Sequence, residues 1–491
     1  MRDEEHGLNR IVVIGGGITG LAAAYRLTER SRSVRLPCDV LLLEAAPQLG
    51  GLISTARRDG FIVESGPDAF ITTKPWALDL IGDLGLSERL IGTNPERRRT
   101  FAVRGEALHP LPEGFLLLAP TRIWPFLRSR LLSWRGKART LLDLRLPRRR
   151  SDADESLASF VRRRFGREAL ARLAQPMIGG IYTADPERLS LRATFPQFLE
   201  MEARHGSVMR ALRREQSAAS PADQAVTGAR YGLFATLDDG LQVLVDALAE
   251  RLPAGAVRLS TPVAGVAREG ARWAVRLRDG AVVGADGVIV TTSAFQAARL
   301  LRDLDPDIAR QLEAIPYASS LTVNLAYRRE EVAHPLDGFG FVVPSCEGRS
   351  IIACSFSSVK FPNRAPAGHV LLRAFAGGAL QPEPLEWDDR TLLTAVHRDL
   401  EELLGIRSAP LWSHVARHPR SMPQYHVGHL RRVQALEGHL NRWPTLKLAG
   451  NAYRGIGIPD SIRSGGAAAH ALLAELDRSP NHSCAGCESL I

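Results

Sequence analysis

The chain has 491 residues, of which 45% are hydrophobic and 24% charged, and its formal net charge at pH 7 is +10. This length favours two or three domains, and this apolar fraction excludes an intrinsically disordered chain. We expect neither a membrane-spanning helix nor a secretory signal, because no run of eighteen apolar residues occurs and the first ten residues are polar.

The positive charge favours an anionic partner, either a membrane surface or a polyacidic small molecule. The alternative is an arginine-rich chain whose charges are spread over a solvated surface. No RNA-binding motif or DNA-reading helix pattern is found, so nucleic acid is not an expected partner. The chain has only five cysteines, and such a low content is typical of proteins in a reducing cytoplasm, where we expect this protein to reside. Cys484 and Cys487 supply only two of the four ligands that a structural zinc site needs. We therefore interpret this segment as a frayed tail and not as a metal site.

A strand, a glycine turn and a helix open the chain. The apolar run at residues 10–14 leads into Gly15, Gly17 and Gly20, and an alanine-rich helix follows. The first glycine permits a tight turn, the second lets a pyrophosphate approach the backbone, and the third allows close packing of helix on strand. The next strand ends at Glu44, where a carboxylate accepts hydrogen bonds from a ribose and disfavours the 2′-phosphate of NADP. The polar segment at residues 31–35 is an expected loop. These features predict a dinucleotide site.

Further glycines follow Glu44. Gly50 and Gly51 stand in an apolar turn, and residues 60–68 form a strand followed by a tight turn at Gly66. An ordinary NAD dehydrogenase does not need this continuation, whereas an enzyme that buries extended FAD does. The sequence therefore favours FAD.

The segment from Arg122 to Arg150 has ten Lys/Arg and one acid, Asp143. Helical patterning continues over residues 154–178, and residues 151–155 offer capping side chains. This composition predicts a helical subdomain that contacts a membrane surface, and the alternative is a solvated basic face. The apolar residues interleaved with the charges are Trp124, Phe126, Leu127, Leu131, Leu132 and Trp134.

Later segments return to the nucleotide sheet or build a second domain. Residues 212–230 are polar and predict a linker, and residues 286–292 predict a strand of the nucleotide sheet. Residues 446–475 predict a strand, a glycine-rich turn and a closing helix. The expected divisions are a FAD-binding domain at 9–92, 228–299 and 441–475, a helical basic subdomain at 93–210, a substrate-binding domain at 300–440 and a tail at 476–491.

With these motifs, the chain resembles the FAD-containing amine oxidase superfamily over about residues 9–475, and within it the oxygen-dependent protoporphyrinogen and coproporphyrinogen oxidases. The resemblance implies an α/β fold, in which a Rossmann-like FAD-binding domain carries an inserted α+β substrate domain and the helical subdomain. Besides the glycine turns, the shared motifs are residues 64–68, 108–114, 179–182, 189–195, 422–425, 428–429 and 448–462.

The resemblance also implies a set of FAD contacts, with the cofactor bound non-covalently. The first turn would bind pyrophosphate, the acid after the second strand would bind ribose, and the last residues would touch the flavin ring. The expected residues are Gly15, Gly16, Gly17, Ile18, Thr19, Gly20, Glu44, Ala45, Gly51, Leu52, Gly66, Pro67, Asp68, Ala69, Val263, Ile456, Gly457 and Ile458.

An arginine before residues 108–114 pairs with a substrate propionate in the resembled family. The aligned position here is Thr100, and Arg97, Arg98 and Arg99 precede it; we assign the contact to Arg99. The alternative for this run is a solvated turn.

The stretch at 108–114 (LHPLPEG) is similar to the branch that oxidises coproporphyrinogen III, and protoporphyrinogen IX is the alternative substrate. Such a reaction removes six electrons in three flavin cycles, with oxygen as acceptor and hydrogen peroxide as product. We assign no catalytic side chain and no metal, since the cofactor carries the chemistry. Tyr425 and His429 are interpreted as structural. The competing functions are an amine oxidase, a carotenoid-type desaturase and a flavin-bound porphyrin carrier that serves a ferrochelatase partner.

Overall fold

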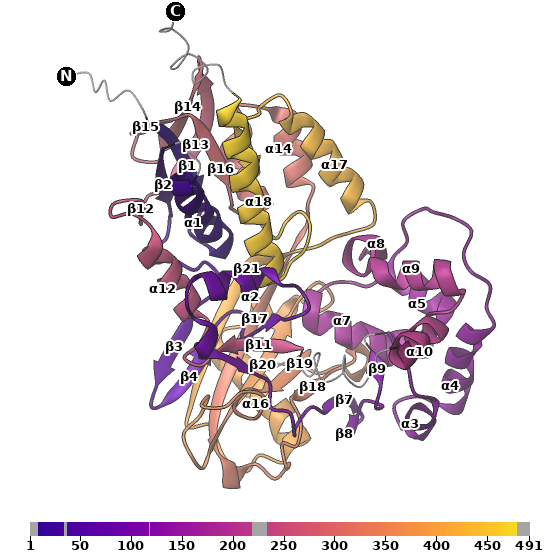
Figure 1. Ribbon diagram of the computed structural model, residues 1–491. Coiled ribbons are helices and arrows are strands. Elements are labelled where there is room, and N and C mark those ends of the chain that lie inside the picture. Colours follow the sequence, from indigo (N-terminus) through magenta and orange to yellow (C-terminus); the bar gives the residue numbers. More distant parts are fainter. Residues whose placement is uncertain (1–7, 34–36, 117, 219–232, 479–491) are drawn as a thin grey trace, which may run out of the picture.

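The computed structural model describes residues 8–33, 37–116, 118–218 and 233–478. Its nucleotide domain is built on a parallel sheet that draws strands from the beginning, middle and end of the chain (Figure 1). The predicted returns of residues 286–292 and 446–448 to this sheet are confirmed. In spatial order the five strands are β12 (Val257–Arg258), β2 (Cys38–Leu43), β1 (Asn9–Ile14), β16 (Gly287–Val290) and β22 (Leu446–Leu448).

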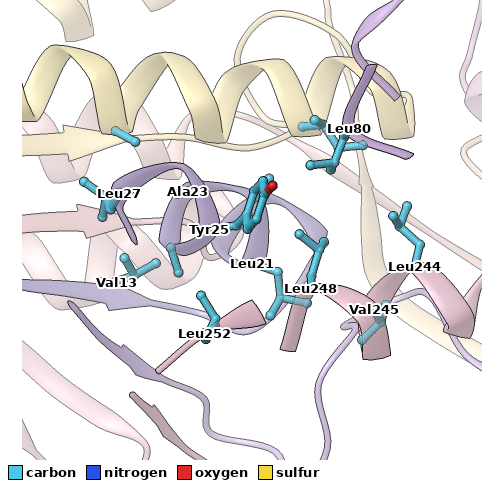
Figure 2. Close-up of a cluster of buried hydrophobic side chains, with 14 of the residues drawn as sticks. Val13, Leu21, Ala23, Tyr25, Leu27, Leu80, Leu244, Val245, Leu248 and Leu252 are labelled. Atoms are coloured by element: carbon cyan, nitrogen blue, oxygen red, sulfur yellow. The ribbon is translucent and has the colours of Figure 1, made fainter. Parts of the chain in front are cut away.

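Helices from three distant parts of the chain share one hydrophobic core with this sheet. Figure 2 shows part of it, where Leu21 of the first helix lies beside Leu248. Gly465 allows the last helix to approach the first, since a Cβ there would overlap the carbonyl oxygen of Thr19. The helices are α1 (Ile18–Ser33), α2 (Trp76–Asp83), α12 (Gln242–Arg251) and α18 (Ile458–Asp477). Because α1 continues to Ser33, the first part of the loop predicted at 31–35 is wrong, and the remainder lies outside the described residues.

A second core lies between the parallel sheet and a small antiparallel sheet, and Trp273 is its largest buried side chain. The sheet consists of β13 (Val263–Glu269), β14 (Arg272–Leu277) and β15 (Val282–Ala285). The helices that join this core are α13 (Ala294–Leu301), α14 (Pro306–Glu313) and α17 (His429–Leu440).

The domain that the sequence predicts to bind substrate is organised around a mixed sheet of seven strands, and α16 (Asp389–Leu404) contributes to its core. Two strands of this sheet, β7 and β8, come from the segment that the sequence predicts to be helical. In spatial order the strands are β21 (Trp412–Pro423), β17 (Tyr317–Arg328), β20 (His369–Gly377), β19 (Ala353–Phe356), β18 (Gly340–Val342), β7 (Thr100–Arg104) and β8 (Ala107–Pro110).

Short strands join these units. They are β3 (Thr55–Arg58) with β4 (Phe61–Glu64), β5 (Phe70–Ile71) with β11 (Phe234–Leu237) and β6 (Leu90–Gly92), and β9 (Phe115–Leu116) with β10 (Ala119–Pro120). Single helical turns occur at η1 (Ser87–Arg89), α15 (Ser357–Lys360), η4 (Arg329–Glu331), η5 (Ser345–Glu347) and η6 (Glu383–Leu385).

Between residues 123 and 218 the regular elements are all helical, and these helices lie together away from the parallel sheet (Figure 1). The first part of the linker predicted at 212–230 is therefore wrong, because α10 continues to Ala218; the remainder, like the tail with Cys484 and Cys487, lies outside the described residues. The elements are α3 (Ile123–Arg128), α4 (Trp134–Leu141), η2 (Leu142–Leu144), α5 (Leu157–Arg164), α6 (Arg167–Ala169), the π-helical turn η3 (Leu170–Ala174), α7 (Gln175–Tyr182), α8 (Leu191–Thr194), α9 (Pro196–His205) and α10 (Val208–Ala218).

The apolar residues of the basic segment differ in burial, and Leu127 is intermediate. Phe126, Leu131 and Leu132 are buried in a small core, so they do not belong to the membrane pattern in which the sequence placed them. Trp124 and Trp134 are 73% and 72% exposed. Among the residues that the structure describes, no helix is both long and apolar enough to cross a membrane.

A buried ion pair lies inside the helical segment. Arg164 donates from Nε to Asp143 Oδ1 at 2.5 Å, and both side chains are fully buried. Asp143 Oδ2 also accepts from the Ser207 hydroxyl and the Met209 N–H. The one acid of the basic segment thus holds two distant helices together.

Candidate cofactor site

The glycine turn between β1 and α1 has the shape that a pyrophosphate requires. Gly15 has a φ of +110°, and a Cβ on Gly20 would overlap the carbonyl oxygen of Gly15 and lie 2.8 Å from Thr291 Oγ1. A Cβ on Gly17 would instead meet no protein atom within 4 Å. The first N–H groups of α1, which include those of Ile18 and Thr19, have no partner within the helix. The turn therefore leaves open space in front of backbone donors.

Glu44 lies against this turn. Its Oε2 accepts from the Gly16 N–H at 2.5 Å, and its Oε1 accepts from the Ala46 N–H at 2.7 Å, across Ala45. A carboxylate has about four lone-pair sites, so two remain for ribose hydroxyls. The Glu44 carbonyl accepts from the Thr261 N–H at 2.8 Å, which brings the start of β13 near, where Val263 stands.

A line of close backbone contacts leads away from the turn. A Cβ on Gly51 would lie 3.2 Å from the Gly17 Cα, and a Cβ on Gly66 would overlap the carbonyl oxygen of Leu52. Leu52 itself is 43% exposed. The glycines thus allow the first turn, residues 50–52 and the turn at Gly66 to pack closely, which brings three sets of expected FAD contacts together.

The turn that contains Pro67 and Ala69 is held by side chains of the seven-stranded sheet. Ser65 and Gly66 receive most of these contacts. The Thr322 hydroxyl donates to the Ser65 carbonyl at 2.8 Å, and His418 Nε2 lies 2.9 Å from the same oxygen. His414 Nε2 is 3.1 Å from Ser65 Oγ, Asn324 Nδ2 donates to the Glu64 carbonyl at 3.2 Å, and Arg373 donates to the Gly66 carbonyl.

Asp68 lies in the same turn and faces two cations. Its Oδ2 is 2.9 Å from Lys360 Nζ, and its Oδ1 is 3.8 Å from Arg373 Nη1. Burial alone would raise the pKa of Asp68, but the charges of Lys360 and Arg373 lower that pKa to about 2. Asp68 is therefore an anion in the folded protein.

The loop before α18 is held in place by Tyr425. Its hydroxyl donates to the Asn451 carbonyl at 2.5 Å and accepts from the Gly455 N–H at 2.8 Å. The ring stacks on His429, with centroids 4.0 Å apart, and burial lowers the pKa of His429 to about 4, so the imidazole is neutral at pH 7. These contacts agree with the structural roles that the sequence assigns to both residues.

The same loop ends where the expected flavin contacts Ile456 and Ile458 flank Gly457, the N-cap of α18. Lys74 Nζ donates to Asp460 Oδ2 at 2.6 Å, which joins the chain after Ala69 to the first turn of α18. The two sets of expected flavin contacts therefore lie on segments that are tied together. The open turn, the closely packed glycine segments and these tied segments fit FAD.

The comparisons with known proteins agree with this geometry. The family model of flavin-containing amine oxidoreductases matches residues 18–473. The chain belongs to this family. Coproporphyrinogen III oxidase of Bacillus subtilis (strain 168) is 37% identical over 463 residues, which are 94% of this chain and 97% of that protein. Protoporphyrinogen oxidase of Homo sapiens is 32% identical over 489 residues, 94% of this chain and 98% of that protein.

Solved structures give the same result. The crystal structure of a protein from Exiguobacterium sp. 255-15, provisionally described as a protoporphyrinogen oxidase, has a TM-score of 0.84 at 33% identity and covers 96% of this chain and 100% of that chain. Putrescine oxidase shares the fold at 16% identity and a TM-score of 0.66, over 95% of this chain and 99% of that chain. The predicted superfamily, the α/β fold with a Rossmann-like sheet and the cofactor FAD are confirmed, and the protein is a FAD-dependent oxidoreductase.

Arg99 lies directly before β7, and its side chain is 68% exposed. Its Nη1 is 3.0 Å from Asp337 Oδ2. Arg97 and Arg98 are also exposed. An exposed pair of this kind contributes only about 0–1 kcal/mol, so it does not prevent Arg99 from exchanging Asp337 for a ligand carboxylate.

The residues that form hydrogen bonds with the turn at Ser65 were not predicted from the sequence. A signal was present for Arg373, since an arginine interrupts the apolar strand His369–Gly377 (HVLLRAFAG). His414 and His418 stand four residues apart in β21, which puts them on one face of that strand. No sequence pattern marks Lys360 as a partner of Asp68, because only the tertiary fold brings the two residues together.

Proposed function

We propose that this protein oxidises coproporphyrinogen III to coproporphyrin III in haem biosynthesis, with FAD as cofactor and oxygen as electron acceptor. The observation that carries the proposal is near-full-length similarity. Three coproporphyrinogen III oxidases are 33–37% identical to this chain, whereas five protoporphyrinogen oxidases are 30–32% identical. Protoporphyrinogen IX oxidation is the second candidate, which the human relative supports.

The roles of the protein in this reaction are binding, orientation and electrostatics. FAD supplies a two-electron acceptor, and a porphyrinogen bridge carbon between electron-rich pyrroles is a ready donor. Gly17 would leave room for the cofactor and Glu44 would hold its ribose end, while the contacts at Ser65 and Tyr425 fix the two backbone segments expected at its flavin end. No acid–base side chain is assigned.

The proposal is tested by porphyrin fluorescence. Purified holoenzyme is mixed in air with coproporphyrinogen III and, separately, with protoporphyrinogen IX, and autoxidation is subtracted. We expect faster formation of coproporphyrin. The reverse order would move the enzyme to protoporphyrinogen, and no acceleration with either substrate, despite bound FAD, would contradict porphyrinogen oxidation and favour an amine oxidase or a carrier.

Arg99→Ala is expected to raise the KM for coproporphyrinogen at least about tenfold, because a charge-assisted hydrogen bond is worth about 1.5–3 kcal/mol. Flavin content should stay unchanged, since the side chain is exposed and paired with Asp337. Arg302→Ala, which removes another exposed arginine paired with a carboxylate, is the matched control. An unchanged KM in Arg99→Ala would remove the propionate role.

We also propose that α3 and α4 touch an anionic membrane surface. Trp124 and Trp134 are the exposed aromatic residues here, and the exposed cations around them are Arg122, Arg128, Arg130 and Arg135. These helices lie at the outer edge of the helical segment (Figure 1). Aromatic and basic side chains together are typical of surfaces that bind the membrane interface.

The double variant Trp124→Ser/Trp134→Ser is expected to lower partitioning onto phosphatidylserine-containing vesicles at least about tenfold, because each lost aromatic side chain removes about 1.5–3 kcal/mol of burial. Vesicle sedimentation measures this. Leu411→Ser, at another exposed apolar side chain, should leave partitioning unchanged. Equal partitioning of the double variant and the parent would mean that this surface faces water.

Transfer of the product to a ferrochelatase stays a prediction, since a porphyrin needs a metal-inserting step after its oxidation. We expect a weak complex, measurable as a shift of the ferrochelatase in analytical ultracentrifugation. Sedimentation of the two proteins as independent species at micromolar concentration would contradict it.

A further inference from the structure

A buried group of charged side chains lies beside the turn at Gly66, and it contains three cations. Lys360 and Arg373, whose side chains are 15% and 4% exposed, both face Asp68. Arg364 is 2% exposed and donates to neutral oxygens, namely the Asp238 and Leu237 carbonyls and the Thr236 hydroxyl. The group is therefore charged and largely removed from water.

Positive charge exceeds negative charge in this group. The carboxylates that face the three cations are Asp68 and Glu64. Burial raises the pKa of Glu64, and even with both carboxylates charged the three cations outnumber them. Nearby Asp238 and Asp239 are neutralised by other partners, the first by Arg89 and the second by Arg57 and Arg89.

Arg373 places this charge directly against the expected flavin path. It donates to the carbonyl of Gly66, while its Nε is buried and has no partner among the described residues. Asn324, its neighbour on β17, has a buried Oδ1 that is likewise without a partner there. Next to Gly66 and the net positive charge, the structure thus contains one buried donor, Arg373 Nε, and one buried acceptor, Asn324 Oδ1, without partners among the described residues.

We propose that Lys360 and Arg373, set against Asp68, raise the reduction potential of the bound flavin. A flavin ring gains negative charge on two-electron reduction, and fixed cations in a site of low dielectric stabilise that charge. Both residues are positioning residues, because they act on the electrostatics of the site. The inference rests on FAD being held by the residues named above and is independent of which porphyrinogen is oxidised.

Two variants are expected to move the potential in opposite directions. Lys360→Met removes a cation and should lower the equilibrium constant for flavin reduction at least about tenfold, equal to about 30 mV for a two-electron couple. Asp68→Asn removes the anion and should raise the potential by a similar amount, whereas Lys360→Arg should restore the parent value. The measurement is a redox titration of purified holoenzyme against a reference dye, without substrate.

Lys137→Met is the matched control, since Lys137 is a buried lysine in the helical segment, and its potential should equal that of the parent. Lys360→Gln keeps a donor toward Asp68 and gives the same test if the methionine variant loses flavin. Unchanged potentials, or shifts of the same sign in the Lys360 and Asp68 variants, would overturn the inference. FAD binding would survive that result, because the FAD content of every sample is measured first.

Discussion

Gly17→Ala is expected to deprive the protein of FAD while leaving the apoprotein as stable as the parent. A methyl group at this position meets no protein atom within 4 Å, and Gly17 does not have a positive φ. The space that the methyl would fill is the space assigned to the pyrophosphate. Overpacking costs about 1–3 kcal/mol, so the Kd for FAD should rise about 5- to 150-fold. The absorbance of bound flavin after gel filtration and the unfolding midpoint of the apoprotein are the two measurements.

Gly20→Ala provides the contrast, because its methyl would strike the Gly15 carbonyl and Thr291 Oγ1 inside the protein. It should lower the stability of the apoprotein itself. Gly438→Ala, in open space on α17, should change neither quantity except for a small gain from helix propensity. If Gly17→Ala retained a full complement of FAD, the pyrophosphate would have to lie elsewhere.

Arg164→Met is expected to be strongly destabilising, by about 3–5 kcal/mol, because it leaves the carboxylate of Asp143 buried without its cation. The two hydrogen bonds from Ser207 and Met209 then remain as the only described compensation for that charge. Equilibrium unfolding in urea, with tryptophan fluorescence as the signal, measures the loss.

Two further variants separate charge burial from loss of packing. Asp143→Asn/Arg164→Met removes both charges and should recover much of the lost stability, since no buried ion is left unpaired. Arg204→Met breaks an exposed pair with Glu200 and should change stability by less than about 1 kcal/mol. Similar losses in Arg164→Met and the double variant would show that packing, and not charge, dominates.

The dinucleotide turn could be predicted because its signal is local. Three glycines, a preceding apolar strand and an acid at the end of the next strand are adjacent in sequence, and each has a steric or hydrogen-bonding reason. The return of residues 446–448 to the sheet was predictable for a similar reason, since an apolar strand, a glycine turn and a helix follow one another there.

The charged group around Asp68 could not be predicted in this way. Lys360 and Arg373 are 292 and 305 residues distant from Asp68, and only the pairing of β17 with β20 brings one of them beside Gly66. The prediction that the apolar residues of the basic segment form a membrane-facing pattern was partly wrong for a related reason. Alternation of cations with Phe126 or Leu131 does not reveal which side faces the core, and the structure buries both residues.

The close packing of α1 against α18 has a consequence for synthesis of the chain on the ribosome. Gly15 and Ile456 are 441 residues apart, so a ribosome that adds about 5–20 residues per second needs roughly 20–90 s to make the second after the first. During this interval the apolar face of α1 is not yet covered by α18, and the parallel sheet does not yet contain β22. The expected FAD site is therefore incomplete until α18 has been synthesised.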